Sequence, residues 1–296
     1  MAMRGQAEFG KLVIFGAGLV GGSFALALKA AGQVQEVIGF GRSLSGLKQA
    51  LEFGIVDRIG INPGHEIPDA DLVLIATPVA QMPEVMARIA PYLGERTLVT
   101  DGGSTKMDAV AAAREFFGGR IGQFIPGHPI AGAEHSGPAA ARADLYRNKK
   151  VVLTPLPENT PLDVARIRSA WEWCGAQIHE LSPAEHDRIF AAVSHLPHLL
   201  SYALVYDLAQ REDSGRLFAF AASGFRDFTR IAASHPEMWR DICLANRLPL
   251  LAELEAYRRQ LDALYAALEA NDGGRLNDVF TAARAARRAW ASEAEK

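Results

Sequence analysis

The first part of the chain alternates short apolar runs with longer segments that carry apolar residues at helical spacing. Runs such as 11–16 and 71–76 are almost continuously apolar, which is typical of strands buried on both faces of a parallel sheet. Several helical segments end in a glycine, a common helix C-terminal residue. The alternation predicts a doubly wound parallel sheet. The predicted strands are 11–16, 36–40, 71–76, 97–100, 123–125, 150–154 and 177–181, and the predicted helices among them are 23–31, 44–53, 81–92, 105–117 and 162–173.

After residue 181 the strand pattern stops and helical spacing continues to the end of the chain. The predicted helices there are 183–193, 196–210, 236–246, 248–268 and 277–291. We therefore predict an α/β domain at residues 1–175 and an all-α domain at residues 176–296. The last two helices carry more apolar surface than the sheet domain can cover, so we expect a homodimer in which residues 176–296 are the all-α dimerisation domain.

A glycine pattern follows the first predicted strand, at Gly16, Gly18 and Gly21, with Leu19 and Val20 between them. A strand before the glycines and a helix after them is the context that dinucleotide binding requires. The first glycine makes the tight turn, the second lets the backbone approach a pyrophosphate, and the third permits close packing of helix on strand. The five residues are therefore predicted to bind the cofactor, and residues 1–175 to form an α/β Rossmann-type dinucleotide-binding domain.

The end of the second predicted strand indicates which dinucleotide is preferred. NAD sites usually place an acidic residue there to bind the ribose hydroxyls. This chain has Gly41, followed by Arg42 and Ser43, which can hold a 2′-phosphate by charge-assisted hydrogen bonds. The pattern favours NADP, with NAD as the alternative, in which case Arg42 is simply a solvated loop cation. Thr77 and Pro78 end a later strand, where open α/β sheets bind ligands.

Composition excludes several classes of protein. The chain has 296 residues, 49% hydrophobic and 22% charged, with a net charge of −3, so we expect a globular protein without a nucleic-acid partner. Its two cysteines form no Cys-x-x-Cys pair, which disfavours disulfides and thiolate metal sites. We see no signal peptide, and no apolar run approaches the roughly 18 residues of a membrane span. A cytoplasmic protein without a membrane partner is expected.

Candidate chemistry begins at residues 124–137, where an apolar run breaks into glycine and proline. Pro129 restricts its own backbone and that of His128, so the imidazole is expected on rigid backbone at a strand end. Such an imidazole suits a general base, although it could simply bond a neighbour. Ser104, after another strand, is either a helix N-cap or a hydroxyl presented to substrate.

A second group of polar residues lies in the helical half. His195 and His198 are three residues apart near the start of an apolar helix, so they share a face. Zinc is disfavoured because no further ligand motif accompanies them. Arg230 follows Asp227 among aromatic residues, and its planar guanidinium suits a carboxylate of a small substrate.

Five motifs together resemble the prephenate/arogenate (cyclohexadienyl) dehydrogenase family. They are Gly16-Ala-Gly-Leu-Val-Gly21, Asp101-Gly-Gly-Ser104, Gly127-His-Pro-Ile-Ala-Gly-Ala-Glu134, Ser194-His-Leu-Pro-His198, and Asp227-Phe-Thr-Arg230 with Trp239-Arg-Asp241. The resemblance covers most of the chain. It implies oxidation of prephenate or arogenate in tyrosine biosynthesis, with hydride transfer to NAD(P) and loss of CO2.

The resemblance also implies roles for individual residues. His128 matches the catalytic histidine that bonds the ring hydroxyl, and Ser104 matches a serine near that hydroxyl and the nicotinamide. His198 matches a histidine near the side-chain end of the substrate, and we assign His195 to the same pocket. Arg230 is similar to an arginine that holds a substrate carboxylate. Glu134 and Asp227 match acids that form an ionic network with it.

Alternatives remain open at this point. A β-hydroxyacid-type dehydrogenase shares the two-domain plan but normally needs a helix-borne lysine, and no lysine lies between Val151 and Glu295. A non-catalytic NADP(H) redox sensor would have no need of the two histidine motifs. The motifs do not separate prephenate from arogenate. With no room for a regulatory domain, any tyrosine feedback would act at the active site.

Overall fold

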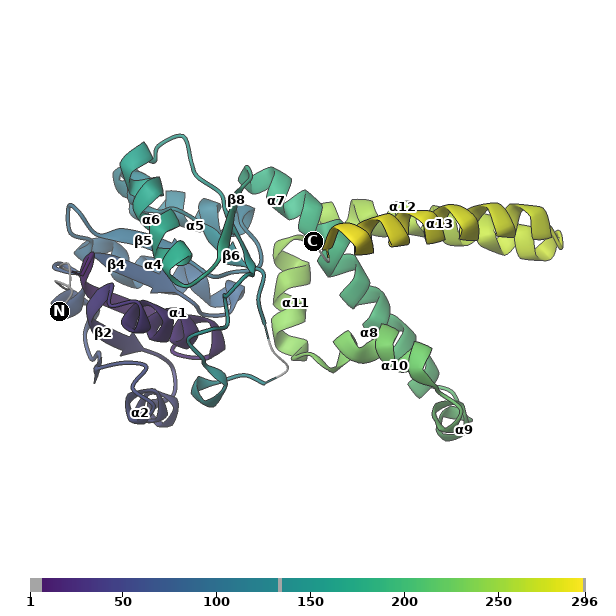
Figure 1. The fold of residues 1–296 in the computed structure, drawn as a ribbon, viewed down its shortest axis with the longest axis horizontal. Coiled ribbons are helices and arrows are strands. Elements are labelled where there is room, and N and C mark those ends of the chain that lie inside the picture. Colours follow the sequence, from purple (N-terminus) through teal and green to yellow (C-terminus); the bar gives the residue numbers. More distant parts are fainter. Residues whose placement is uncertain (1–6, 133–134, 295–296) are drawn as a thin grey trace. The chain divides into compact units, whose positions relative to one another are not determined.

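The computed structural model describes residues 7–132 and 135–294. The described residues form two compact units, one ending at Arg247 and one beginning at Leu248. Figure 1 traces both. The boundary that we predict near residue 175 rests on the change from strands to helices rather than on packing, so it stays a prediction.

A five-stranded parallel sheet forms the centre of the first unit, as the alternating pattern predicts. Its order is β3-β2-β1-β4-β5. The strands are β1 (Phe9–Phe15), β2 (Val34–Phe40), β3 (Arg58–Ile59), β4 (Leu72–Ile75) and β5 (Leu98–Asp101). In register, Leu12 of β1 lies opposite Val37 of β2 and Leu72 of β4. The two-residue β3 escaped prediction because it is too short to show a period.

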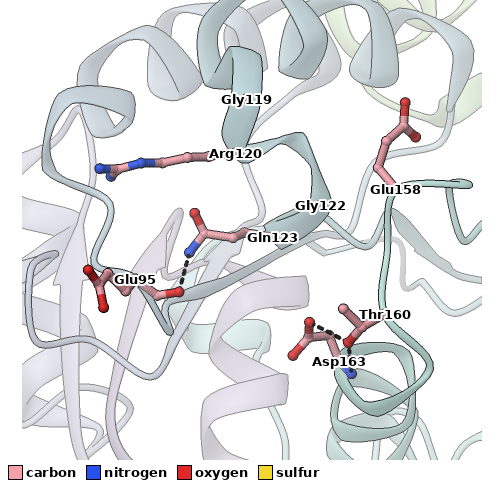
Figure 2. A pocket seen from close by; sticks show the side chains of 8 residues that line it. All are labelled: Glu95, Gly119, Arg120, Gly122, Gln123, Glu158, Thr160 and Asp163. Atoms are coloured by element: carbon pink, nitrogen blue, oxygen red, sulfur yellow. Dashed lines mark hydrogen bonds between the residues drawn. The ribbon is translucent and has the colours of Figure 1, made fainter.

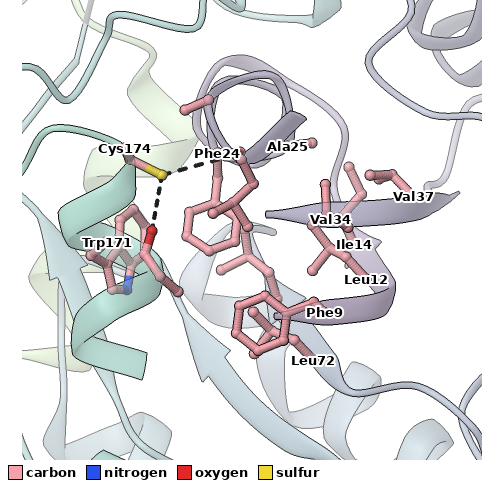
Figure 3. Packing of buried hydrophobic residues seen from close by; sticks show 14 of the residues in the cluster. Phe9, Leu12, Ile14, Phe24, Ala25, Val34, Val37, Leu72, Trp171 and Cys174 are labelled. Atoms are coloured by element: carbon pink, nitrogen blue, oxygen red, sulfur yellow. Dashed lines mark hydrogen bonds between the residues drawn. The ribbon is translucent and has the colours of Figure 1, made fainter. Parts of the chain in front are cut away.

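Helices cover both faces of this sheet. They are α1 (Leu19–Ala30), α2 (Leu44–Glu52), α3 (Pro63–Glu66), α4 (Met82–Ile89), α5 (Met107–Phe117) and α6 (Pro161–Trp173), with 3-10 turns at Val79–Gln81, Ala90–Tyr92, Gly118–Gln123 and Pro138–Ala140. Alternate residues of β1 enter different cores, because successive strand side chains point to opposite faces. Leu12 belongs to a cluster with Phe24 and Trp171, whose rings lie 4.5 Å apart (Figure 3), whereas Val13 belongs to a second cluster.

The later strands form a separate sheet, which corrects the prediction of one parallel sheet. It has the order β6-β7-β8, with β6 (Gly127–Pro129), β7 (Lys150–Leu153) and β8 (Gln177–Glu180). β6 runs antiparallel to β7 and pairs His128 with Val152. The predicted strand at 123–125 is also displaced, since Phe124 makes only an isolated bridge to Val99. His128 therefore lies within a strand rather than at the end of one.

One continuous helical rod, Pro183–Ala209, follows the sheets. It consists of α7 (Pro183–Phe190), a π-helical turn (Ala191–His195) and α8 (Leu196–Ala209). By length and composition alone this rod could cross a membrane, contrary to our expectation that no such segment exists. Its buried Asp187 and His195 contact the rest of the first unit. The unit continues with α9 (Ser214–Ala219), α10 (Ser223–Thr229), a 3-10 turn (Arg230–Ala233) and α11 (Pro236–Ala245).

The second unit is a helical hairpin of α12 (Arg247–Glu269) and α13 (Gly273–Ala294). The chain turns between the helices at Asn271, whose φ of 51° is left-handed. Large apolar side chains remain exposed, among them Tyr265, Phe280 and Trp290. Such surface on a long hairpin is typical of a subunit interface.

Candidate active site

The glycine turn leaves room for a ligand at one position only. Gly16 has a φ of +97°, and a Cβ there would lie 2.5 Å from the carbonyl oxygen of Ala76. A Cβ on Gly21 would overlap the carbonyl oxygen of Gly16. A Cβ on Gly18 would instead meet nothing closer than Gly137, at 3.9 Å. Gly16 and Gly21 are therefore needed by the fold, and Gly18 keeps the α1 N-terminus open, which fits a pyrophosphate.

Three further observations fit a bound dinucleotide. No side chain caps the N-terminus of α1, so its N–H groups are available to an anion. A cavity of about 610 Å³ is lined by Leu19, Ser136 and Arg142, among others. The buried Oγ1 of Thr77, next to Pro78 after β4, has no hydrogen-bond partner among the described residues. A polar ligand would supply one.

The residues predicted to select NADP divide into two roles. Ser43 is the N-cap of α2, where its hydroxyl accepts a hydrogen bond from the N–H of Gly46 at 3.2 Å. Arg42 is exposed and makes no hydrogen bond or ion pair with another described residue. A Cβ on Gly41 would touch Leu47 at 3.4 Å, an ordinary contact, so a side chain is tolerated there.

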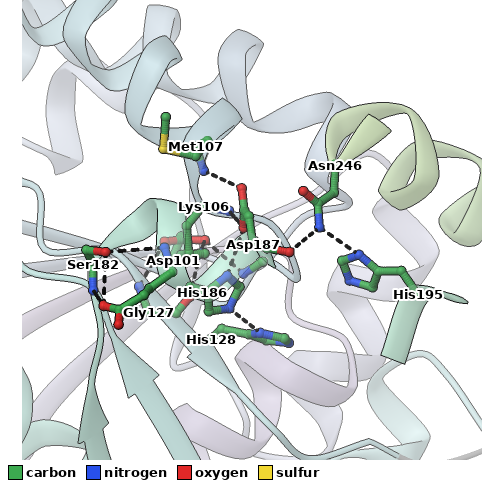
Figure 4. A network of polar contacts seen from close by, with 12 residues as sticks. Asp101, Lys106, Met107, Gly127, His128, Ser182, His186, Asp187, His195 and Asn246 are labelled. Atoms are coloured by element: carbon green, nitrogen blue, oxygen red, sulfur yellow. Dashed lines mark hydrogen bonds and ion pairs between the residues drawn. The ribbon is translucent and has the colours of Figure 1, made fainter. Parts of the chain in front are cut away.

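His128 begins a chain of hydrogen bonds that ends at a carboxylate (Figure 4). Its Nδ1 lies 2.8 Å from Nε2 of His186, and Nδ1 of His186 lies 2.8 Å from Oδ1 of Asp187. His128 is half-buried, whereas His186 and Asp187 are buried. Phe190, one turn further along α7, packs against both imidazoles. The predicted base thus has partners that the sequence did not reveal.

Asp187 also caps α5 from another part of the chain. Its carboxylate accepts hydrogen bonds from the N–H groups of Lys106 at 2.8 Å and Met107 at 2.9 Å. A carboxylate at a helix N-terminus is stabilised by the helix dipole and by the unsatisfied N–H groups. Ser104 is therefore not the N-cap of α5, which leaves its hydroxyl for the other predicted role.

A buried ion pair fixes the backbone in front of His128. The ammonium of Lys106 pairs with Asp101 and donates to the carbonyl oxygen of Gly127 at 2.6 Å. Asp101 in turn accepts the N–H of Gly127 at 3.0 Å. Both charged side chains are fully buried. The end of β5 is thereby joined to the start of β6, directly before the imidazole.

The strand that carries His128 adjoins the nucleotide site. A Cβ built on Gly102, just after β5, would lie 2.9 Å from Cγ1 of Val20 and 3.8 Å from Cδ of Pro129. Val20 is in the first turn of α1, and Pro129 follows His128 in β6. Val20 and Pro129 therefore lie on either side of the Gly102 backbone, which places the strand of His128 close to the N-terminus of α1.

The other predicted histidines lie on the same helical rod. His195 is buried, and its Nδ1 lies 3.0 Å from Nδ2 of Asn246. His198 donates from Nδ1 to the carbonyl oxygen of Ser194 at 2.8 Å and stacks on Trp239, with ring centroids 3.5 Å apart. Asn246 and Trp239 come from α11 and its C-terminus, so tertiary packing brings them to the site.

Arg230 begins the 3-10 turn after α10, on the exposed surface. Its charge lowers the pKa of His198, after the larger effect of burial, so the two predicted substrate residues are near each other. Asp227 is exposed on α10. Glu134 lies outside the described residues, and its predicted network with Arg230 stays a prediction.

Burial lowers the pKa of the site histidines His128, His186 and His195, which favours their neutral form. Burial, followed by the charges of His186, Lys106 and His195, holds the pKa of His128 well below its ordinary value. Burial likewise lowers the pKa of His186 and brings that of His195 to about 4. For Asp187, burial raises the pKa, but hydrogen bonds from His186 and the α5 backbone outweigh it, so the net pKa is lowered. The result is neutral imidazoles around one carboxylate.

A different hollow, of about 360 Å³, lies elsewhere on the sheet domain (Figure 2). Its polar groups serve the fold. Gln123 donates to the carbonyl oxygens of Gly94 and Thr97, and Arg120 donates to that of Leu93. No predicted site residue lines it. In the described part of the chain, no three His, Cys, Asp or Glu side chains are placed to hold a metal ion.

Comparison with known proteins identifies the family. Residues 24–180 match the family model described as prephenate dehydrogenase, nucleotide-binding domain, and residues 182–282 match prephenate dehydrogenase, dimerization domain. This chain belongs to the prephenate dehydrogenase family. The family resemblance, the Rossmann-like fold and the oxidoreductase class inferred from sequence are thus confirmed.

Individual relatives in the family cover nearly the whole chain. A cyclohexadienyl dehydrogenase from Zymomonas mobilis is 34% identical over 281 residues, which cover 94% of this chain and 95% of that protein. The crystal structure of prephenate dehydrogenase from A. aeolicus, in complex with hydroxyphenyl propionate and NAD+, has a TM-score of 0.88 and 32% identity, covering 94% of this chain and 97% of that one. The crystal structure of Synechocystis arogenate dehydrogenase has a TM-score of 0.81 and 30% identity. The match covers 95% of this chain and 99% of that one. A nicotinamide cofactor fits this family and the open glycine turn.

Proposed function

We propose that this chain oxidatively decarboxylates prephenate, arogenate or both, in tyrosine biosynthesis, using NAD(P) as hydride acceptor. The observation that carries the proposal is the uncharged His128, held by a buried hydrogen-bond chain on a strand that adjoins the nucleotide site. A redox sensor without catalysis would not need a base in this place. The names of the relatives support the substrate class.

The chemistry divides between cofactor and protein. When bound, the nicotinamide ring accepts the hydride from C4 of the cyclohexadienyl ring. His128 accepts the proton of the C4 hydroxyl as the carbonyl forms, a role that typically contributes about 10²–10⁴-fold. The bond from the ring to its carboxylate then breaks, CO2 leaves, and the electron pair enters the ring. The oxygen at C4 becomes a phenol by regaining a proton, which His128 is placed to return.

The remaining predicted residues would orient the substrate. Arg230 would bind a substrate carboxylate bidentately, with His198 near the same end of the molecule. Ser104, whose hydroxyl is not used as a helix cap, would lie near the reacting hydroxyl and the nicotinamide. His195 would line the pocket, and Asp227 and Glu134 would surround Arg230.

NADP is proposed as the preferred cofactor. No acidic side chain occupies position 41, and Arg42 has no partner in the described chain that would compete with a 2′-phosphate. Ser43 contributes less than its sequence position suggests, because its hydroxyl already caps α2. One charge-assisted hydrogen bond is worth roughly 1.5–3 kcal/mol, or about ten- to hundredfold in affinity.

Three variants test the cofactor preference through the NADP-to-NAD ratio of kcat/KM. Arg42→Ala should lower the ratio about tenfold or more, and Arg42→Lys should keep part of it, because the charge remains. Gly41→Asp should shift the ratio toward NAD through repulsion, in a position with room for the side chain. A wild type that prefers NAD would contradict the proposal, and an unchanged ratio in Arg42→Ala would remove Arg42 as its cause.

Assembly, location and feedback complete the proposal. The match of residues 182–282 to a dimerization domain and the exposed apolar side chains of the hairpin support a homodimer. A cytoplasmic location and tyrosine inhibition at the active site are proposed from sequence alone. Adding tyrosine to the assay tests the second, since a tyrosine that competes with substrate would raise KM without changing kcat.

The activity itself has a direct test. The protein is mixed with NADP or NAD and either prephenate or arogenate, and absorbance of reduced nicotinamide is followed. Growth of the band with at least one substrate supports the proposal, and the four kcat/KM values rank the substrates. Binding of the cofactor without turnover of either substrate would refute it.

A further inference from the structure

Asp187 contacts the site in two directions. Its side chain reaches His128 through His186, and its backbone carbonyl oxygen accepts a hydrogen bond from Nδ2 of Asn246 at 2.7 Å. The same Asn246 nitrogen lies 3.0 Å from Nδ1 of His195 (Figure 4). Asp187 is thus linked to two of the predicted site histidines, His128 and His195, and each link determines which ring nitrogen carries the proton.

The side-chain link decides the tautomer of His128. An ionised carboxylate only accepts hydrogen bonds, so Nδ1 of His186 must carry the proton that points to Asp187. Nε2 of a neutral His186 is then an acceptor, and Nδ1 of His128 must donate to it. His128 therefore keeps its proton on Nδ1, and its Nε2 has a lone pair for the substrate proton.

The hydrogen bond to the backbone carbonyl oxygen of Asp187 determines the tautomer of His195, which is the opposite of the His128 tautomer. A carbonyl oxygen only accepts, so the Asn246 atom facing Asp187 must be the amide nitrogen. The second hydrogen on that nitrogen is directed to Nδ1 of His195, which must accept it. His195 therefore carries its proton on Nε2 and is a donor.

We propose that Asp187 holds His128 and His195 in opposite tautomers, one as proton acceptor and one as hydrogen-bond donor at Nε2. His186 and Asn246 are the positioning residues that transmit this choice. The roles assigned to the two Nε2 atoms rest on the proposed function, whereas the tautomers themselves rest on the hydrogen bonds alone.

The groups around the His128–His186–Asp187 hydrogen bonds favour this arrangement. Lys106 and Asp101 form their own buried ion pair beside the histidines, and Asp187 is held by the N–H groups of α5. When Nε2 of His128 takes the substrate proton, Nδ1 still donates its own proton to Nε2 of His186, and the two nitrogens lie 2.8 Å apart. The positive charge can then be shared with the His186–Asp187 pair, which avoids an isolated buried cation.

The tautomers can be measured directly, without an assay of enzymatic activity. In protein labelled with ¹⁵N-histidine, NMR distinguishes a protonated ring nitrogen from an unprotonated one. At neutral pH we expect His128 protonated at Nδ1 and His195 protonated at Nε2, with signals assigned through His128→Gln and His195→Gln. A wild-type His128 protonated at Nε2, or a His195 protonated at Nδ1, would overturn the proposal even if the enzyme is active.

Substitutions separate positioning from general stability. His186→Gln can keep an acceptor oxygen for His128, whereas His186→Leu cannot. We expect kcat to fall about 10–100-fold in His186→Leu, by analogy with the loss seen when the hydrogen-bond partner of a metal-bound histidine is removed. KM should change little, and His186→Gln should retain most of the activity. His179→Gln, the same change at an exposed histidine, is the control.

Asn246→Ala tests the second link. It should leave the His128 signals as they are and let His195 populate both tautomers. Equal kcat values for folded His186→Leu and wild type would refute the positioning role. Failure of the proposed function is a separate result, because it would appear as a wild type with the expected NMR signals and no turnover of either substrate.

Discussion

Substitution of two neighbouring glycines should separate folding from cofactor binding. Gly18 and Gly21 lie in the same turn, yet an added methyl group meets different surroundings at each. At Gly18 its nearest neighbour is Gly137 at 3.9 Å, and the φ of −85° suits alanine. At Gly21 it overlaps the carbonyl oxygen of Gly16. We expect Gly18→Ala to impair binding and Gly21→Ala to impair stability.

The magnitudes follow from these contacts. Gly18→Ala lowers the entropy of the unfolded chain, worth about 0.4–1 kcal/mol, so its stability should equal or slightly exceed that of wild type. Its methyl group occupies the place where a pyrophosphate would contact backbone N–H groups. Loss of one charged hydrogen bond, about 1.5–3 kcal/mol, raises Kd roughly ten- to hundredfold. Gly21→Ala overpacks a rigid backbone contact at a cost of about 1–3 kcal/mol.

Thermal denaturation and calorimetric titration with NADP and NAD measure both effects. One kcal/mol corresponds to about 2–4 °C in a unit of this size, so Tm should fall by roughly 2–12 °C in Gly21→Ala and not in Gly18→Ala. Gly119→Ala is a control away from the turn, because an added Cβ there meets no atom within 4 Å and the φ of Gly119 is not positive. Wild-type affinity in Gly18→Ala would show that the cofactor does not approach this residue, and the interpretation of the turn would be wrong.

Four further predictions concern the site and the assembly. His128→Asn should bind cofactor and fold normally but lose about 10²-fold or more in kcat, measured with saturating substrate; near-normal turnover would exclude it as the base. Arg230→Ala should raise KM far more than it lowers kcat, because a carboxylate contact is largely uniform binding, and an unchanged KM would make the residue structural. The folded pKa values of His128 and His195 lie below 6.5, so the unfolded chain binds more protons as pH falls from 6.5 toward about 4. Stability should fall over that range, and Tm should depend less steeply on pH in His195→Gln; an equal slope would contradict the assignment. Sedimentation should give a dimer of the 32.0 kDa chain, and a monomer at all concentrations would refute the assembly.

Acid pH should also reduce activity through the base itself. Proton acceptance requires neutral His128, so kcat/KM should decline as pH drops through its pKa. Because burial lowers that pKa, the decline should occur below the ordinary value of 6.5. A pH–rate profile measures it, and an acid limb well above that value would indicate that a different group controls the rate.

Local patterns predicted most of the first unit. Continuous apolar runs, glycine turns and helical spacing reflect backbone sterics and the faces that are buried. Each of these patterns can be recognised in a short segment of sequence. They located the strands of the parallel sheet and the glycines of the nucleotide site. They failed at β3, which is too short to show a hydrophobic period. They also failed at the second sheet, because the local sequence does not determine which strands pair or in which direction.

The partners of His128 lie beyond any local pattern. His186 is 58 positions away along the chain and Asp187 is 81 positions from Lys106, whose N–H it binds. The adjacent pair His186-Asp187 on a predicted helix was the available signal, but nothing in the sequence says which strand that helix packs on. The sequence by itself determined the family, the nucleotide-binding turn and the candidate base. Only the tertiary structure decided the hydrogen-bond partners, because they depend on how α7 packs across β6 and the start of α5, and hence which nitrogen of each imidazole carries the proton.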